Sequence, residues 1–212
     1  MNSKRKLLEA LREMANLKDV IRDTHGNVSC IEPGGIVRIK PSGMEYSLIS
    51  EEDICSVAVI DGHDLGSIRT PSVDTKNHLD IYRRHPWVGA ICHTHSPHAT
   101  AFAWAQAPIP CYGTEQADYF GGEIRCLQYA DLDSWGDRVE LREGERAVLL
   151  GRHGCLTFAE DPVTAVKLAI ALENIAEKAY LARELHYYPF DPMPQDQVDR
   201  WHKRYLHGYG QR

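Results

Sequence analysis

Two histidines one residue apart, His93 and His95, directly follow the apolar run 87–92, and this pair is the clearest candidate for metal chemistry. The run is typical of a buried strand. Side chains alternate along a strand, so the two imidazoles would project together from one side of its end. The pair alone leaves two interpretations open, a metal site and two ordinary core or surface histidines.

A third histidine, His153, follows a second apolar run, residues 146–151, and so also lies at the end of a predicted strand. Three histidines with one open position are typical of a catalytic divalent metal, and we expect zinc, although another divalent ion is possible. Asp74 is the best candidate for a fourth ligand or for a group that orients a ligand. It also lies in the first turn of a predicted helix, where the helix dipole alone would favour a carboxylate.

The segment Lys40-Pro41-Ser42-Gly43 follows a predicted strand and could bind a phosphate. Backbone amides near Gly43 and the Ser42 hydroxyl would donate hydrogen bonds, and Lys40 would supply charge. The alternative is an ordinary turn, because Pro, Ser and Gly are common turn residues.

Composition excludes several classes of protein. The chain has 212 residues, 43% hydrophobic and 25% charged, and a net charge of -6 without a basic stripe, so we expect no nucleic-acid partner. No apolar run is long enough to span a bilayer, and no signal-peptide segment follows the charged start. The six scattered cysteines include no Cys-x-x-Cys pair, which predicts reduced core cysteines in a cytoplasmic protein.

The coarse pattern predicts one domain, residues 1–212, without a linker or repeat. We expect a helix over 4–17, a hairpin within 24–39 and the longest, most apolar helix over 161–185. Residues 109–122 are predicted to form a loop with a short helix. The polar stretch 131–145 predicts a surface helix, and the aromatic tail is expected to dock rather than fray.

Several of these segments together resemble the class II aldolase and L-ribulose-5-phosphate 4-epimerase family. They run nearly end to end: His25-Gly26-Asn27-Val28-Ser29, Lys40-Pro41-Ser42-Gly43, Pro71-Ser72-Val73-Asp74-Thr75, His93-Thr94-His95-Ser96, Ala117-Asp118-Tyr119-Phe120, Arg152-His153-Gly154 and Tyr209-Gly210-Gln211. The resemblance implies a single-domain α/β fold, a three-layer α/β/α sandwich around a mostly antiparallel sheet. It also implies a homotetramer with active sites at the subunit interfaces.

The resemblance assigns roles to individual residues. Zinc would be bound by His93, His95 and His153, with Asp74 beside them. Asp118 and Tyr209 would be the catalytic acid/base pair, with Tyr209 reaching into a neighbour's site. The substrate and its phosphate would be held by Asn27, Lys40, Ser42, Gly43, Ser72 and Thr114.

Within the family, Asp74, the Ala-Asp-Tyr-Phe segment and the near-terminal Tyr209 resemble the epimerase branch, whereas the aldolase branch has Glu in place of Asp74. The expected reaction is inversion of C4 in a ketopentose 5-phosphate by cleavage and re-formation of the C3–C4 bond. Direct proton abstraction is implausible because the C4 hydrogen is not acidic. The metal would stabilise the negative charge on the cleaved fragment. Asp118 and Tyr209 would transfer protons on the two faces of the aldehyde.

Two other functions stay open from the sequence. One is an aldolase or other lyase on a related sugar phosphate such as L-fuculose 1-phosphate. The other is a non-catalytic, adducin-head-like assembly protein, which the three histidines disfavour. The chain also departs from the epimerases: Val73 replaces a serine, Gln116 replaces a histidine, and the chain is shorter around 130–145 and in the tail.

Overall fold

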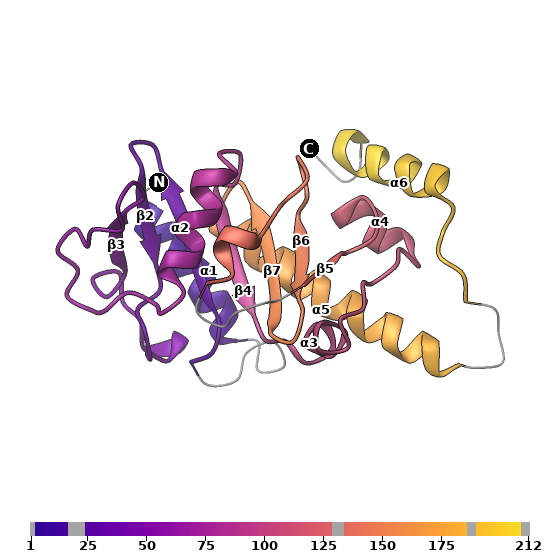
Figure 1. The fold of residues 1–212 in the computed structure, drawn as a ribbon, viewed down its shortest axis with the longest axis horizontal. Coiled ribbons are helices and arrows are strands. Elements are labelled where there is room, and N and C mark those ends of the chain that lie inside the picture. The colour runs from indigo at the N-terminus through magenta and orange to yellow at the C-terminus, as the bar shows by residue number, and fades with distance from the viewer. Residues whose placement is uncertain (1–2, 17–23, 129–133, 186–189, 209–212) are drawn as a thin grey trace.

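The computed structural model describes residues 3–16, 24–128, 134–185 and 190–208. Within this part of the chain, seven strands form one sheet in the order β3-β2-β1-β4-β7-β6-β5 (Figure 1). The strands are β1 (Asn27–Glu32), β2 (Ile36–Ile39), β3 (Cys55–Ala58), β4 (Ala90–Thr94), β5 (Cys126–Leu127), β6 (Ala147–Leu150) and β7 (Gly154–Ala159). Every adjacent pair is antiparallel except β5 and β6, so the sheet is mostly antiparallel, as expected.

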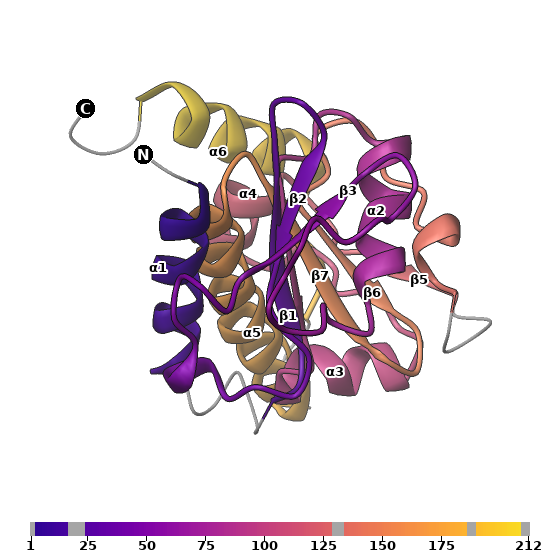
Figure 2. The same ribbon diagram turned by 90° about the vertical axis from the view of Figure 1, so that its left-hand side faces the viewer.

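Helices cover both faces of this sheet. They are α1 (Ser3–Ala15), α2 (Thr75–Arg84), α3 (Pro97–Trp104), α4 (Thr114–Phe120), α5 (Pro162–Glu184) and α6 (Gln195–Gly208), with short 3₁₀ helices η1 (Tyr46–Leu48) and η2 (Gly136–Arg138). Figure 2 shows α1 and α5 on one side of the sheet and α2 on the other. The predicted three-layer α/β/α sandwich is therefore confirmed.

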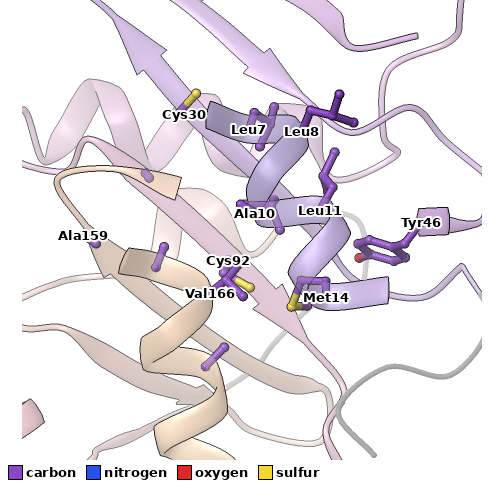
Figure 3. Close-up of a cluster of buried hydrophobic side chains, with 14 of the residues drawn as sticks. Leu7, Leu8, Ala10, Leu11, Met14, Cys30, Tyr46, Cys92, Ala159 and Val166 are labelled. Atoms are coloured by element: carbon purple, nitrogen blue, oxygen red, sulfur yellow. The ribbon is translucent and has the colours of Figure 1, made fainter. Parts of the chain in front are cut away.

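The core follows from the alternation of side chains along the central strands. Ala90 and Cys92 of β4 face the layer of α1 and α5, where they meet Leu7, Leu11 and Val166 (Figure 3). Ile91 faces the opposite layer with Leu79 and Ile81 of α2. His93 lies two residues after Ile91 and therefore points to the same side of the sheet, the side of α2.

The longest helix is confirmed almost to the residue. Asp161 caps α5, because its carboxylate accepts hydrogen bonds from the backbone N–H groups of Val163 and Thr164. Pro162 occupies the first turn, where a missing N–H costs nothing. The predicted docking of the tail is also confirmed up to Gly208: α6 packs on α4, and His202 Nδ1 lies 3.0 Å from the Ala117 carbonyl oxygen.

The predicted surface helix over 131–145 is wrong for the residues described, 134–145. Only η2 is helical there, and Trp135 and Val139 are buried against the core beneath α2. The polar composition misled the prediction, because two apolar side chains anchor an otherwise polar, irregular segment. All six cysteines are free, and five are buried, as expected. No helix in the described ranges has the length and apolar character needed to cross a bilayer.

Candidate metal centre and substrate cavity

The three predicted histidines converge at one edge of the sheet. His93 Nε2 lies 3.0 Å from His95 Nε2 and 3.0 Å from His153 Nε2. The antiparallel register explains the meeting, because the end of β4 lies beside the start of β7. His153 reaches the cluster from the tight turn between β6 and β7. In that turn Arg152 adopts a left-handed backbone conformation with φ of 65°.

A glycine lets these strands approach closely. A Cβ at Gly154 would lie 2.5 Å from the carbonyl oxygen of Thr94 and 3.3 Å from Cε1 of the His93 ring. Any side chain there would push β7 away from β4 and separate the histidines. The Arg-His-Gly segment therefore places the candidate ligand His153 and also lets β7 pack close to β4.

The donor set fits a divalent cation. His93 Nδ1 lies 3.0 Å from the carbonyl oxygen of Cys155, so that nitrogen carries the hydrogen and Nε2 keeps its lone pair toward the cluster. Burial lowers the pKa of His95 to about 4, and burial also lowers those of His93 and His153. All three rings are therefore neutral at pH 7, the form that binds a metal.

Asp74 lies at the N-terminus of α2 beside this cluster. Its Oδ2 accepts a hydrogen bond of 2.7 Å from Asn27 Nδ2, and Asn27 pairs with His93 in the β1–β4 register. Burial acts to raise the pKa of the Asp74 carboxyl, but the His93 and His78 rings and the Asn27 amide outweigh it, so the pKa is lowered. Asp74 is therefore an ionised carboxylate next to three imidazoles.

The histidines open into a cavity of about 400 Å³. Its lining includes most of the predicted site: Asn27, Lys40, Ser42, Gly43, Ser72, Asp74, His95 and His153. An isolated bridge between Pro41 and Pro71 holds the loop after β2 against the loop before α2, which explains how Ser42 and Ser72 reach one cavity. His25 also lines it, with its ring 5.8 Å from that of His95, although sequence reasoning assigned it no role beyond its place in a motif.

Lys40 is the unusual residue of this cavity. It is only 2% exposed, and Nζ donates to the carbonyl oxygens of Pro41 and Thr24 at 3.2 and 3.4 Å. Among the described residues no carboxylate forms an ion pair with it. Burial lowers its pKa to about 8. A buried cation without a counter-ion is costly, and an anionic ligand would offset that cost.

Two predicted site residues lie elsewhere. Thr114 and Asp118 are on α4 and do not line this cavity. Burial raises the pKa of the Asp118 carboxyl, while Arg204 and His202 of α6 act to lower it. Tyr209 lies outside the described residues. The structure therefore brings together the predicted metal and phosphate residues but leaves Thr114 and Asp118 apart from them within one chain.

Residues 5–180 match the model of a known family, described as the class II aldolase and adducin N-terminal domain. The chain belongs to this family. The mostly antiparallel α/β fold is thus that of a class II aldolase-type domain, and its three converging histidines form a group that could hold a metal ion.

Solved structures with this aldolase fold agree along nearly the whole chain. An L-fuculose 1-phosphate aldolase is 25% identical, covers 96% of each chain and has a TM-score of 0.86. The L-fuculose-1-phosphate aldolase from Thermus thermophilus is 24% identical over 87% of this chain and 98% of its own, with a TM-score of 0.74. An aldolase II superfamily protein from Pseudomonas syringae is 19% identical over 97% of this chain and 84% of its own, with a TM-score of 0.81.

Proposed function

We propose that this protein is a divalent-metal-dependent epimerase that inverts C4 of a ketopentose 5-phosphate, converting L-ribulose 5-phosphate into D-xylulose 5-phosphate. The supporting observation is one cavity whose lining includes His95, His153, the Asp74 carboxylate and the buried cation of Lys40. The ring of His93 converges on the two lining histidines. Zinc is the proposed metal, and a cytoplasmic location is proposed from the free cysteines. The proposal fits a small substrate with oxygen ligands at one end and a phosphate at the other.

His93, His95 and His153 would hold the cation, with Asp74 next to them. When bound, the cation supplies a Lewis acid that stabilises negative charge on the oxygens of the ketone fragment. A base takes the C4 hydroxyl proton as the C3–C4 bond breaks, and the bonding electrons remain on C3. The aldehyde fragment then rotates so that its opposite face points toward C3. C3 adds to that face, and an acid returns a proton to the new alkoxide. Inversion therefore needs proton-transfer groups on both faces.

Asp118 and Tyr209 are the proposed proton-transfer groups. Because Asp118 lies on α4, away from its own chain's cavity, it would serve the site of a neighbouring subunit, as the proposed homotetramer requires. Thr114, at the start of the same helix, would contact substrate from the same direction. Exposed apolar side chains on α5, Tyr180 and Leu181, are consistent with an assembly.

Assembly is tested directly by light scattering. We expect about four times the 24.0 kDa mass of the chain at micromolar concentration. A monomer at that concentration would contradict both the tetramer and the shared site, because Asp118 would then have no neighbouring cavity to reach.

Lys40 offers a test of the phosphate end. Lys40→Met keeps the length and the apolar stem but removes the charge, so the substrate KM should rise about 10- to 100-fold, the usual effect of losing a charged hydrogen bond. Because the Lys40 pKa is lowered to about 8, kcat/KM of the unchanged enzyme should fall as the pH rises through 8. The variant should lack this alkaline fall. An unchanged KM would exclude Lys40 from phosphate binding.

Val73 tests a departure from the epimerases. Its side chain is 85% exposed at the rim of the cavity, between Ser72 and Asp74. Val73→Ser should restore a hydroxyl to the phosphate end and lower KM about 10-fold, with little change in kcat. Steady-state kinetics measure both constants. A lower kcat at constant KM would place this position near the reacting carbons instead.

An aldolase acting on L-fuculose 1-phosphate is the alternative, supported by the likeness to the 25% identical aldolase structure. The same metal site would serve it. Side-by-side assays of the zinc-loaded protein on L-ribulose 5-phosphate and L-fuculose 1-phosphate distinguish the two. We expect D-xylulose 5-phosphate from the first and little aldehyde from the second, and the reverse would establish the aldolase. Three intact histidines disfavour a non-catalytic, adducin-head-like role.

A further inference from the structure

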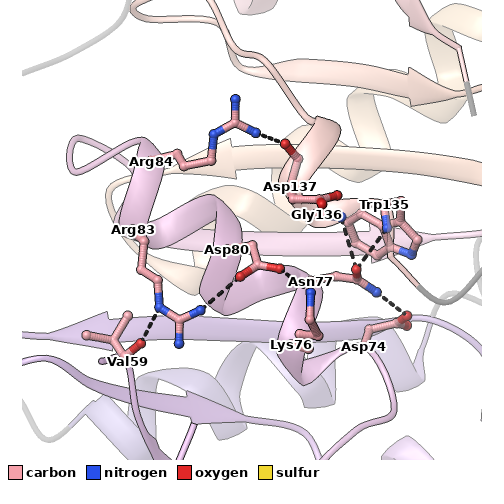
Figure 4. A network of polar contacts seen from close by, with 10 residues as sticks. All are labelled: Val59, Asp74, Lys76, Asn77, Asp80, Arg83, Arg84, Trp135, Gly136 and Asp137. Carbon is pink, nitrogen blue, oxygen red and sulfur yellow. Dashed lines mark hydrogen bonds and ion pairs between the residues drawn. The ribbon is translucent and has the colours of Figure 1, made fainter. Parts of the chain in front are cut away.

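A buried side chain on α2, Asn77, lies between Asp74 and the segment that carries Trp135 (Figure 4). Asn77 is 2% exposed. Its Oδ1 accepts hydrogen bonds from two consecutive backbone N–H groups, those of Trp135 and Gly136, each at 3.0 Å. Two donors on one side identify that atom as the oxygen, so the NH₂ group must be the other end. It faces Asp74, with Nδ2 3.5 Å from Oδ1 of the carboxylate.

The backbone at Gly136 packs directly on Asn77. A Cβ at Gly136 would lie 2.3 Å from the Asn77 carbonyl oxygen and 2.4 Å from its Cα. No side chain fits in this space, so the segment lies flat on the first turn of α2. This contact fixes where the preceding residue, Trp135, enters the core.

The indole of Trp135 forms the inner wall of the histidine cluster. It is 2% exposed, and its ring centroid lies 5.5 Å from that of His93 and 6.2 Å from that of His153. It also meets the edge of the buried His78 ring at 6.2 Å. A large rigid ring against two ligand imidazoles limits how far either can rotate.

We propose that Asn77 is a positioning residue for the metal centre, because its amide anchors the Trp135–Gly136 backbone and thereby packs the indole against His93 and His153. The NH₂ end of the same amide faces Asp74, so one side chain ties the carboxylate and the aromatic wall together. This inference rests on the proposed function, in which these histidines hold a divalent cation. It adds a residue of α2 that neither the histidine pattern nor the phosphate loop indicates.

Cobalt(II) is a suitable probe, because its absorption and its quenching of tryptophan fluorescence report binding without any substrate. In metal-free full-length protein, Asn77→Ala should weaken cobalt affinity about 10- to 100-fold, the usual effect of removing a group that supports metal ligands. It should also make Trp135 more accessible to acrylamide. Asn77→Asp keeps an oxygen for both N–H groups, so Trp135 should stay shielded in this variant.

A matched control is available on the same helix. Arg84 also holds this segment, through the Asp137 carbonyl oxygen and through Glu140 at 2.7 Å, but on the protein surface. Arg84→Ala should leave cobalt affinity and Trp135 shielding unchanged. Equal effects from the Arg84 and Asn77 variants would indicate general loosening and would overturn the proposal.

The proposal also fails if Asn77→Ala binds cobalt as tightly as the unchanged protein, or binds it weakly with Trp135 still shielded. If Asn77→Ala does not fold, Trp135→Leu provides the same test, because it leaves both backbone N–H groups on Asn77. Undiminished cobalt affinity in that variant would overturn the inference. Failure of the unchanged protein to bind cobalt would instead contradict the proposed function, so the two failures are distinguishable.

Discussion

His95→Ala and His153→Ala should each leave the purified protein without stoichiometric metal and lower turnover at least about 10³-fold. A divalent cation contributes several kcal/mol of charge stabilisation, and each 1.36 kcal/mol is a factor of about ten in rate. Both rings meet His93 Nε2 at 3.0 Å, so either substitution removes one of three converging nitrogens. Metal analysis after dialysis, together with initial rates, measures the two effects.

His98→Ala is the matched control for this experiment. His98 follows the same strand, but its Nδ1 lies 2.8 Å from Oε1 of Glu173, away from the cluster. The backbone N–H groups of His98 and Ala99 still bond Glu173 when the ring is removed. The control should therefore retain its metal. Full metal occupancy in either ligand variant would contradict the three-histidine site.

Tyr209→Phe should lower epimerase turnover about 10²- to 10⁴-fold, the usual contribution of a positioned proton-transfer group. The change removes only a hydroxyl near the end of the chain, so folding, metal content and assembly should persist. Asp118→Asn should have an effect of similar size on the opposite face of the aldehyde. Stopped assays of both epimers, with detection of released glycolaldehyde phosphate, measure turnover and leakage.

The two variants should differ in one respect. Losing a proton donor on one face hinders one epimer more than the other, so each variant should release glycolaldehyde phosphate mainly from one substrate. Asp199→Asn, an exposed change on α6, is a suitable control and should have full turnover. A fully active Tyr209→Phe protein would show that the tail is not catalytic and would remove the most specific support for the epimerase proposal.

Local patterns predicted three histidines at strand ends, and the structure brings these histidines together. A His-x-His pair at the end of β4 must project to one side. The apolar run before His153 places that residue after β6, in the turn that leads into β7, the neighbour of β4. The candidate phosphate-binding segment 40–43 was ambiguous in sequence, because the same residues make ordinary turns. Its place in the cavity depends on the burial of Lys40 and on the bridge between Pro41 and Pro71, which joins two loops.

Other features depend on tertiary contacts that no local pattern records. The polar stretch around Trp135 predicted a surface helix, whereas Asn77 and Gly136 hold it in an irregular conformation against α2. Asn77 itself resembles an ordinary helical residue in the sequence. The separation of Asp118 from the cavity could not be foreseen either, since the path of α4 relative to the sheet is set by its packing on α5 and α6.

The proposed reaction inverts C4 by breaking and re-forming a carbon–carbon bond at the proposed metal centre. The most direct measurement is conversion of L-ribulose 5-phosphate by the zinc-loaded protein in deuterium oxide, followed by NMR of the product. We expect D-xylulose 5-phosphate that keeps its original hydrogen at C4, because that C–H bond is never broken. Deuterium at C4, or the absence of any D-xylulose 5-phosphate, would contradict it.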